Sequence, residues 1–223
     1  MIKKFKSSNF YEIKNMSIKI KINKRLKDFI FQEILNSKKL IIISPWISEE
    51  TAKMLLDLAS RNIEVSLITT NDTSEFHKKG LKNLIGVERK IKREGNTVLA
   101  RLGILLFIFG ALLALINFFG IILSILGIFL FLKFRRIFEE ICFPKIKNLI
   151  ITKEKLHAKL ILTEKLIGIG SPNFTYSGLI SNIESFAWIE DRETYEKLID
   201  EINKLIEKLK ENSVEYREIL KNF

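Results

Sequence analysis

Up to residue 70 the chain shows the hydrophobic periodicity of an α/β domain. Apolar and polar residues alternate over 18–22, which predicts a half-buried strand, and a helical spacing of apolar residues follows over 24–36. An apolar run at 39–44, rich in β-branched residues and ended by a proline, predicts a buried strand. A helix over 49–60 and a strand over 63–70 complete a strand, helix, strand unit, so we expect a parallel pair of strands.

The second half of the chain has several short strands and closes with a helix. Four apolar stretches predict the strands, at 149–152, 158–163, 166–169 and 185–189. The closing helix carries an apolar stripe formed by Tyr195, Leu198, Ile199, Ile202, Leu205, Ile206 and Leu209. Neither half has enough strands and covering layers to be stable alone, so we expect an α/β fold in which both halves share one mixed sheet flanked by helices.

Between the two halves lies a segment without any charged residue, at 102–132. As one helix these 31 residues would be roughly 46 Å long at about 1.5 Å per residue, well beyond a hydrocarbon core of about 30 Å. A transmembrane hairpin of two helices that turns near Asn117 and Gly120 fits better than a single tilted span or a re-entrant loop. Two glycine pairs at seven-residue spacing put small residues on one face of each arm: Gly103 with Gly110, and Gly120 with Gly127. They would let the arms pack closely, although glycine is common in membrane helices in any case.

Basic residues flank the apolar segment on both sides. They are Lys82, Arg89, Lys90, Lys92, Arg93 and Arg101 before it, and Lys133, Arg135, Arg136, Lys145, Lys147 and Lys153 after it. The positive-inside rule then predicts a multi-pass protein of the cell membrane, with the soluble parts and both termini in the cytoplasm. The lysine-rich beginning has no apolar run of signal-peptide length, so we expect no cleaved leader. The expected segments are a basic N-terminal stretch at 1–23, a first soluble part at 24–97, the hairpin at 98–136 and a second soluble part at 137–223.

Composition narrows the classes of partner and of metal site. The formal net charge of +11 favours polyanionic partners, either nucleic acid or an anionic membrane surface. The single Cys142 excludes a disulfide framework and multi-cysteine metal clusters, and we interpret it as a small buried or membrane-edge hydrophobe. Two histidines exclude His-rich metal sites, so the fold must be held by packing.

Residues with chemical potential concentrate in the second half. His157 and Lys159 lie two apart in a predicted strand, so their side chains should leave the same face and offer a nucleophile or base beside a cation. After a turn at Glu164 the chain reaches Gly170-Ser171-Pro172-Asn173, where a hydroxyl, backbone N–H groups and an amide can surround a phosphate oxyanion. Asn182 and Glu184 share a face at the start of the next strand, and Glu184 could fix the tautomer of the His157 imidazole.

This combination resembles the phospholipase D superfamily, whose signature is H-x-K-x4-D followed by G-S-x-N and often by N-x-E. The matching residues are His157, Lys159, Glu164 in the position of the aspartate, Gly170, Ser171, Asn173, Asn182 and Glu184. The resemblance covers roughly 24–98 and 140–210 and leaves the hairpin outside. Two departures are the longer carboxylate of Glu164 and a spacing from Glu164 to Gly170 that is one residue shorter than usual.

The resemblance implies a phosphodiesterase that needs neither metal nor cofactor. One histidine would attack phosphorus to give a phosphohistidine, and a second would protonate the leaving oxygen and later activate water. Because the chain has one motif, it is similar to single-motif nucleases that pair two subunits, which implies a homodimer with His157 of each chain in one site. Lys159 and Asn173 would bind phosphate oxygens, Ser171 would assist, and Glu184 would orient His157.

Two other residues were considered for the site. We interpret His77, in a polar stretch, as a surface residue, and Trp46 either as part of the site entrance or as core. Phe186 and Trp188 are expected to be core or sheet-face residues. Three functions remain open: a membrane-held phosphodiesterase acting on nucleic acid, which we favour; a phospholipid hydrolase or transphosphatidylase; and a non-catalytic membrane scaffold suggested by Glu164.

Overall fold

The computed structural model describes residues 17–221, and the chain divides into two compact units. The first unit contains the residues up to Gly86 together with those from Phe143 onward. The second unit is Val87–Cys142. Most of the basic stretch expected at 1–23 lies outside the described residues.

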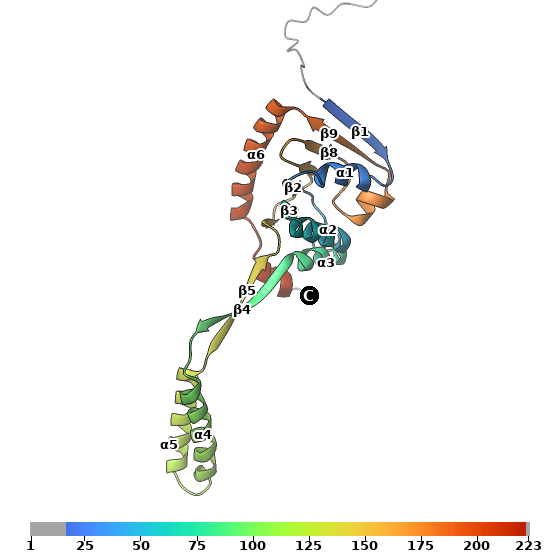
Figure 1. Cartoon of the computed structure of the whole chain (residues 1–223). Helices are drawn as coiled ribbons and strands as arrows, with labels where there is room; N and C mark the ends of the chain where they lie inside the picture. Colours follow the sequence, from blue (N-terminus) through green and yellow to red (C-terminus); the bar gives the residue numbers. More distant parts are fainter. Residues whose placement is uncertain (1–16, 222–223) are drawn as a thin grey trace, which may run out of the picture. The chain divides into compact units, whose positions relative to one another are not determined.

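The first unit is built on a seven-stranded mixed sheet with the strand order β1-β9-β8-β7-β2-β3-β6 (Figure 1). The strands are β1 Ser17–Asn23, β2 Lys39–Ile43, β3 Glu64–Thr70, β6 Asn148–Thr152, β7 Leu160–Leu162, β8 Ile167–Gly170 and β9 Glu184–Glu190. β2, β3 and β6 are parallel, whereas β7, β8, β9 and β1 alternate in direction. β2 pairs with β3 on one side and with β7 on the other, so the two halves of the chain share one sheet, as predicted.

Helices cover both faces of this sheet. They are α1 Lys27–Ile34, α2 Glu49–Ser60, α3 Glu75–Leu84, α6 Arg192–Glu211 and α7 Tyr216–Lys221, with a short π-helix at Ser177–Ser181. α6 lies on one face, and α1, α2 and α3 lie on the other (Figure 1). Asp191 begins α6 because its carboxylate accepts a hydrogen bond from the Thr194 amide at 2.9 Å.

The alternation of side chains along the strands divides the core between these two faces. The face under α6 contains Ile41, Ile43, Ile68, Ile150, Leu162 and Ile167 from the sheet and Ile202 and Leu209 from the helix. The opposite face buries Leu40, Ile42, Val65 and Leu67. Since β2 is covered on both faces, its sequence is a continuous apolar run and not an alternating one.

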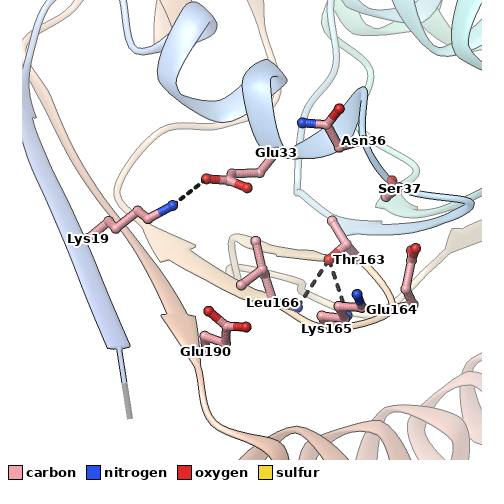
Figure 2. A pocket seen from close by; sticks show the side chains of 9 residues that line it. All are labelled: Lys19, Glu33, Asn36, Ser37, Thr163, Glu164, Lys165, Leu166 and Glu190. Atoms are coloured by element: carbon pink, nitrogen blue, oxygen red, sulfur yellow. Dashed lines mark hydrogen bonds and ion pairs between the residues drawn. The ribbon is translucent and has the colours of Figure 1, made fainter. Parts of the chain in front are cut away.

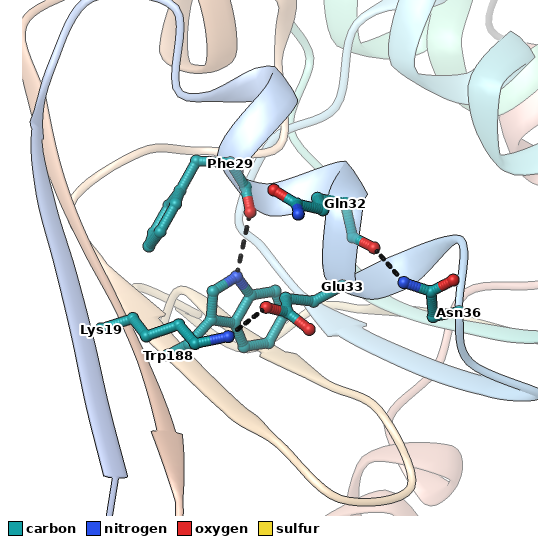
Figure 3. A network of polar contacts seen from close by, with 6 residues as sticks. All are labelled: Lys19, Phe29, Gln32, Glu33, Asn36 and Trp188. Atoms are coloured by element: carbon teal, nitrogen blue, oxygen red, sulfur yellow. Dashed lines mark hydrogen bonds and ion pairs between the residues drawn. The ribbon is translucent and has the colours of Figure 1, made fainter.

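An aromatic cluster joins α1 to β9, and Figure 3 shows Trp188 beside Phe29. Phe186 and Trp188 are both buried, which confirms that they are core residues. The Trp188 indole N–H donates a hydrogen bond to the Phe29 carbonyl at 3.3 Å, and the Phe186 and Trp188 rings meet edge to face at 5.2 Å between centroids. A β-carbon added to Gly168 would lie 2.8 Å from the Trp188 ring, so the ring occupies the space that glycine leaves. Lys19 of β1 forms an ion pair with Glu33 of α1 at 2.8 Å.

The α6 side of the sheet stays open at its β1 end. Ile18, Ile20 and Ile22 point to this side and are 47, 68 and 70% exposed, and Ile169 of β8 is 44% exposed. They share one face because Ile20 and Ile169 both pair with Ala187 of β9. We call this surface the open face; it consists of Ile18, Ile20, Ile22, Ile169 and Ala187.

The second unit is a helical hairpin with a two-stranded ribbon at its base. β4 Ile85–Arg93 pairs with β5 Ile137–Pro144, and the hairpin consists of α4 Thr97–Ala114 and α5 Phe119–Phe134. Of the described helices, α4 alone is long and apolar enough to cross a membrane, and α5 is a shorter apolar helix. The unit extends beyond the hairpin expected at 98–136, because the ribbon residues belong to it and not to the soluble halves.

Glycines line the contact between the two helices. A β-carbon on Gly103 would lie 2.6 Å from the Phe131 amide nitrogen, and one on Gly110 would lie 2.7 Å from Ser124 Oγ. Gly120 and Gly127 meet the backbone of α4 in the same way. The two backbones therefore approach more closely than any larger side chain at these positions would permit.

Candidate functional site

All the candidate residues except Glu164 lie toward one edge of the sheet, where β2, β3 and β6 end. β7 is antiparallel to β2 with Leu160 opposite Ile43, so β7 begins at this edge. β8 ends there and β9 begins there, because Leu160 pairs with Ile169 and Gly170 with Phe186. In open α/β sheets, ligands bind outside the carboxyl ends of the strands. We call this the carboxyl edge.

His157 and Lys159 lie directly before β7, which begins at Leu160 and not at residue 158 as predicted. No partner strand covers this stretch, so the backbone is irregular and the imidazole is exposed. The two side chains nevertheless lie together, as predicted, with Lys159 Nζ 3.4 Å from His157 Nε2. Lys159 Nζ also donates a hydrogen bond to the His157 carbonyl at 2.9 Å. The motif thus presents an imidazole nitrogen beside a fixed positive charge.

Glu184 holds the turn at the end of β8. Its carboxylate accepts hydrogen bonds from Ser171 Oγ and, at 3.1 Å, from the Asn182 side-chain amide. The Ser171 N–H donates to the Ser185 carbonyl at 2.9 Å, and Ser171 Oγ accepts from the Ser185 N–H at 3.0 Å. Glu184 therefore fixes Ser171 and Asn182, and among the described residues no hydrogen bond joins it to His157, so its predicted role in orienting the imidazole stays a prediction.

The loop after Ser171 is fastened to the end of β2 and to the start of α2. The Phe174 N–H donates to Ser44 Oγ at 2.8 Å, and the Phe174 carbonyl accepts from Thr51 Oγ1 at 2.7 Å. Ser48 Oγ accepts from the Tyr176 N–H at 3.0 Å. Sequence reasoning missed these three hydroxyl groups, because each supports a loop more than a hundred residues away along the chain.

Asn173 lies in this anchored loop and is unusual in its hydrogen bonding. Its side-chain Oδ1 is buried and has no hydrogen-bond partner within the described part of the chain. A buried polar atom without a partner is costly and marks a site that awaits a ligand, a water or a rearrangement. Because Oδ1 only accepts hydrogen bonds, this atom would need a donor, and phosphate binding by Asn173 stays a prediction that involves its side-chain N–H groups.

His77 contradicts its prediction as a surface residue, because its side chain is fully buried in α3. Its Nδ1 accepts a hydrogen bond from the Ile47 N–H at 3.0 Å, which requires Nε2 to carry the proton and donate to the Thr70 carbonyl at 2.8 Å. Burial lowers the pKa of His77, although the hydrogen bond that Nε2 donates to the Thr70 carbonyl opposes the shift. The neutral ring holds the 45–48 segment against the end of β3, and this segment in turn supports the Phe174 loop.

Glu164 lies at the opposite edge, beyond the other end of β7. Its carboxylate accepts hydrogen bonds from the N–H groups of Lys38 at 3.1 Å and Lys39 at 3.3 Å. Burial alone would raise its pKa, but the backbone N–H groups of Glu164 itself, Lys38 and Lys39 stabilise the carboxylate, and the net shift lowers the pKa. Glu164 also lines a cavity of about 220 Å³ with Lys19, Glu33 and Glu190 (Figure 2). Its role in this chain is to fasten the β7–β8 turn to the start of β2.

A second cavity, of about 270 Å³, opens at the carboxyl edge beside the motif. It is lined by Pro45, Trp46, Thr70, Asn71, Asp72, Thr152, Lys153, Glu154, Lys155 and Leu156. Trp46 is half-buried in its wall, which is the entrance position considered from sequence. Within residues 17–221 no group of three or more His, Cys, Asp or Glu side chains is placed to hold a metal ion.

Comparison with known proteins defines the fold. No family model and no curated protein sequence matches the chain. Among solved structures it is similar to Nuc from Salmonella typhimurium, a phospholipase D family member, with a TM-score of 0.53 and 12% identity over 91% of this chain and 99% of that one. NucT from Helicobacter pylori matches with a TM-score of 0.48 and 13% identity over 90% and 99% of the two chains. Phosphatidylserine synthase from Haemophilus influenzae matches with a TM-score of 0.46 and 13% identity, over 91% of this chain and 41% of that one.

The likeness to Nuc shows that the chain has the phospholipase D fold, as the sequence resemblance predicted.

Proposed function

We propose that this protein is a metal-independent phosphodiesterase of the phospholipase D type. The observation that carries the proposal is the pairing of the His157 imidazole with the Lys159 ammonium at the exposed carboxyl edge. Support comes from the fold, from the anchored loop that presents Ser171 and Asn173, and from the cavity beside the motif.

In the proposed reaction an imidazole nitrogen of His157 attacks phosphorus, and the bond from phosphorus to the leaving oxygen breaks. The leaving oxygen takes a proton from a second imidazole. That imidazole then removes a proton from water, the water oxygen attacks the phosphohistidine, and His157 is released. Lys159 would neutralise the phosphate oxygens, Asn173 would donate its amide N–H groups to them, and Ser171 would assist.

The second imidazole would be His157 of the partner subunit, which makes the functional unit a homodimer. The chain has two histidines, and His77 is buried with both ring nitrogens hydrogen-bonded, so it is not free for the role. The open face supports this arrangement, because an uncovered row of isoleucines next to the carboxyl edge is suited to burial against a second copy. The site is incomplete without that copy.

We further propose that the hairpin holds the enzyme at the cell membrane, with the catalytic unit and both termini in the cytoplasm. Its support is the apolar α4, the apolar α5 and the basic residues near both helix ends. The net charge of +11 favours nucleic acid as substrate, whereas attachment to a bilayer favours a phospholipid hydrolase or transphosphatidylase. Nuclease binding should weaken steeply with salt, while lipid turnover should depend on the surface concentration of lipid.

The test of the activity is an assay in EDTA with detergent-solubilised protein, wild type against His157→Ala. Single-stranded DNA, RNA and an anionic phospholipid are offered in parallel. Loss of activity with His157, and an acid-labile phosphorylated protein on rapid quenching, would support the mechanism and identify the substrate. Inactivity on all three substrates by a folded dimer would favour the non-catalytic scaffold.

The shared site has its own test, in which wild-type and His157→Ala chains are co-expressed in varied proportion. If both imidazoles are required, activity per total protein follows the square of the wild-type fraction, because mixed dimers are inactive. A linear dependence, or full activity in a monomer by sedimentation, would refute the shared site and leave the chemistry of His157 intact.

A further inference from the structure

The tip of the helical hairpin is apolar apart from Asn117. Leu115 is 85% exposed, Ile116 80%, Phe118 71% and Phe119 78%. Asn117 is the polar residue of the turn, and no charged residue occurs between Arg101 and Lys133. If this turn emerged into water on the far side of a membrane, four large apolar side chains would be exposed to water, which is unfavourable.

The turn satisfies several of its own backbone N–H groups within the hairpin. The N–H groups of Leu115, Ile116 and Asn117 donate to carbonyls of the last turn of α4, at 2.9–3.3 Å. The Gly120 N–H donates to Asn117, at 3.3 Å to both its carbonyl and its side-chain oxygen, so the Asn117 side chain caps the start of α5. Hydrocarbon excludes backbone whose polar groups need water, and this turn supplies acceptors from within the hairpin.

Counted from Thr97, α4 has the length to cross a membrane, but its charge-free part is shorter because Arg101 lies within the helix. From Leu102 to Leu115 the charge-free part of the first arm has 14 residues, about 21 Å at about 1.5 Å per residue. The hydrocarbon core is about 30 Å thick. With Arg101 and Lys133 at the entry surface, the tip therefore ends several ångströms before the far surface. The close contact at the four glycines keeps the arms together, so the hairpin inserts as one wedge.

From these observations we infer that the hairpin enters the bilayer from one side and ends within the hydrocarbon, so that it anchors the protein without crossing. This inference rests on the proposed membrane attachment. It differs from the two complete crossings expected from charge alone, although both arrangements keep the two ends of the hairpin on the same side.

The single native cysteine makes the test direct. In a Cys142→Ser background, Ile116→Cys places a thiol at the tip and Glu94→Cys places one at the base, where the side chain is exposed. A membrane-impermeant maleimide is applied to spheroplasts, which expose the outer side, and to inverted vesicles, which expose the cytoplasmic side. We expect Glu94→Cys to react in inverted vesicles, and Ile116→Cys to react in neither preparation until detergent is added.

Labelling of Ile116→Cys in spheroplasts would show a complete crossing and overturn the inference. Labelling of Ile116→Cys in inverted vesicles, or loss of the protein from membranes in flotation, would instead show that the hairpin is not inserted and would refute the attachment itself. As a second measurement, Ile116→Lys should reduce the alkali-resistant membrane fraction at least fivefold, while Val98→Lys at the base should leave it unchanged. Equal fractions for these two variants would also overturn the inference.

Discussion

The buried imidazole of His77 should make the stability of the catalytic unit depend on pH. Its folded-state pKa lies below the ordinary value of 6.5, because burial opposes the charge and Nδ1 must stay free to accept the Ile47 N–H. The unfolded chain binds a proton near pH 6.5 and the folded chain does so only at lower pH, so protonation favours unfolding. Stability is therefore full above pH 6.5 and falls as the pH is lowered through that value.

The largest possible effect follows from the unfolded-chain pKa of 6.5 alone. If the folded ring stays neutral throughout, lowering the pH from 7.5 to 5.5 removes about 1.4 kcal/mol from the free energy of unfolding. In this range only the unfolded chain takes up a proton, and a difference of one bound proton changes the free energy of unfolding by about 1.4 kcal/mol for each pH unit. Carboxylates with lowered pKa values, such as Glu164, act at lower pH and contribute little in this window.

The assay is urea unfolding of the full chain in detergent at pH 7.5, 6.5 and 5.5, followed by tryptophan fluorescence. Both tryptophans, Trp46 and Trp188, belong to the first unit, so the signal does not report on the hairpin. His77→Gln can keep both hydrogen bonds without titrating and should lose the pH dependence. His157→Gln, a change at the exposed histidine, should retain it. Equal pH dependence in His77→Gln and wild type would refute the assignment.

Three further changes test other contacts. Glu164→Ala should lower the free energy of unfolding by about 1–3 kcal/mol, because two backbone N–H groups lose their acceptor, and Glu164→Gln should recover part of this in the same urea assay. Ile20→Lys should convert the dimer to monomer in sedimentation and abolish activity while near-UV circular dichroism stays unchanged; an active Ile20→Lys dimer would exclude the open face as the interface. Gly127→Leu should separate the helices of the hairpin and lower membrane-bound yield, whereas Leu126→Ala on the exposed side should not; equal yields would show that the close contact is dispensable.

Much of the fold was predictable because most strands and helices are local patterns. The apolar run of β2 follows from burial on both faces, and the helical stripe of α6 follows from burial on one side. The alternation at 18–22 predicted the strand β1 correctly, but the expectation that it is half-buried was wrong, because its isoleucines are exposed. The ribbon β4–β5 was not predicted. Its residues are mostly exposed, and its cross-strand pairs, such as Arg89 with Glu140 at 3.2 Å, leave no hydrophobic period in the sequence.

The site was predictable as a set of residues and less so as a set of contacts. His157 and Lys159 were found by spacing, and their proximity holds although the strand begins after them. The partners of Glu184 and the burial of His77 depend on segments distant in sequence, which no local pattern reports. The residues next to His77 in the sequence are mostly polar, which is typical of a surface position. In the fold its side chain instead contacts the segment after β2 and the end of β3.

The strand order has a consequence for the biosynthesis of the protein. β2 lies between β3, which precedes the hairpin along the chain, and β7, which follows it. A ribosome therefore releases the hairpin while β2 still lacks its partner on one side, and that partner begins directly after His157 and Lys159. The apolar hairpin is therefore complete before the sheet of the first unit can close, and His157 and Lys159 are added only when the strand that completes β2 is about to follow.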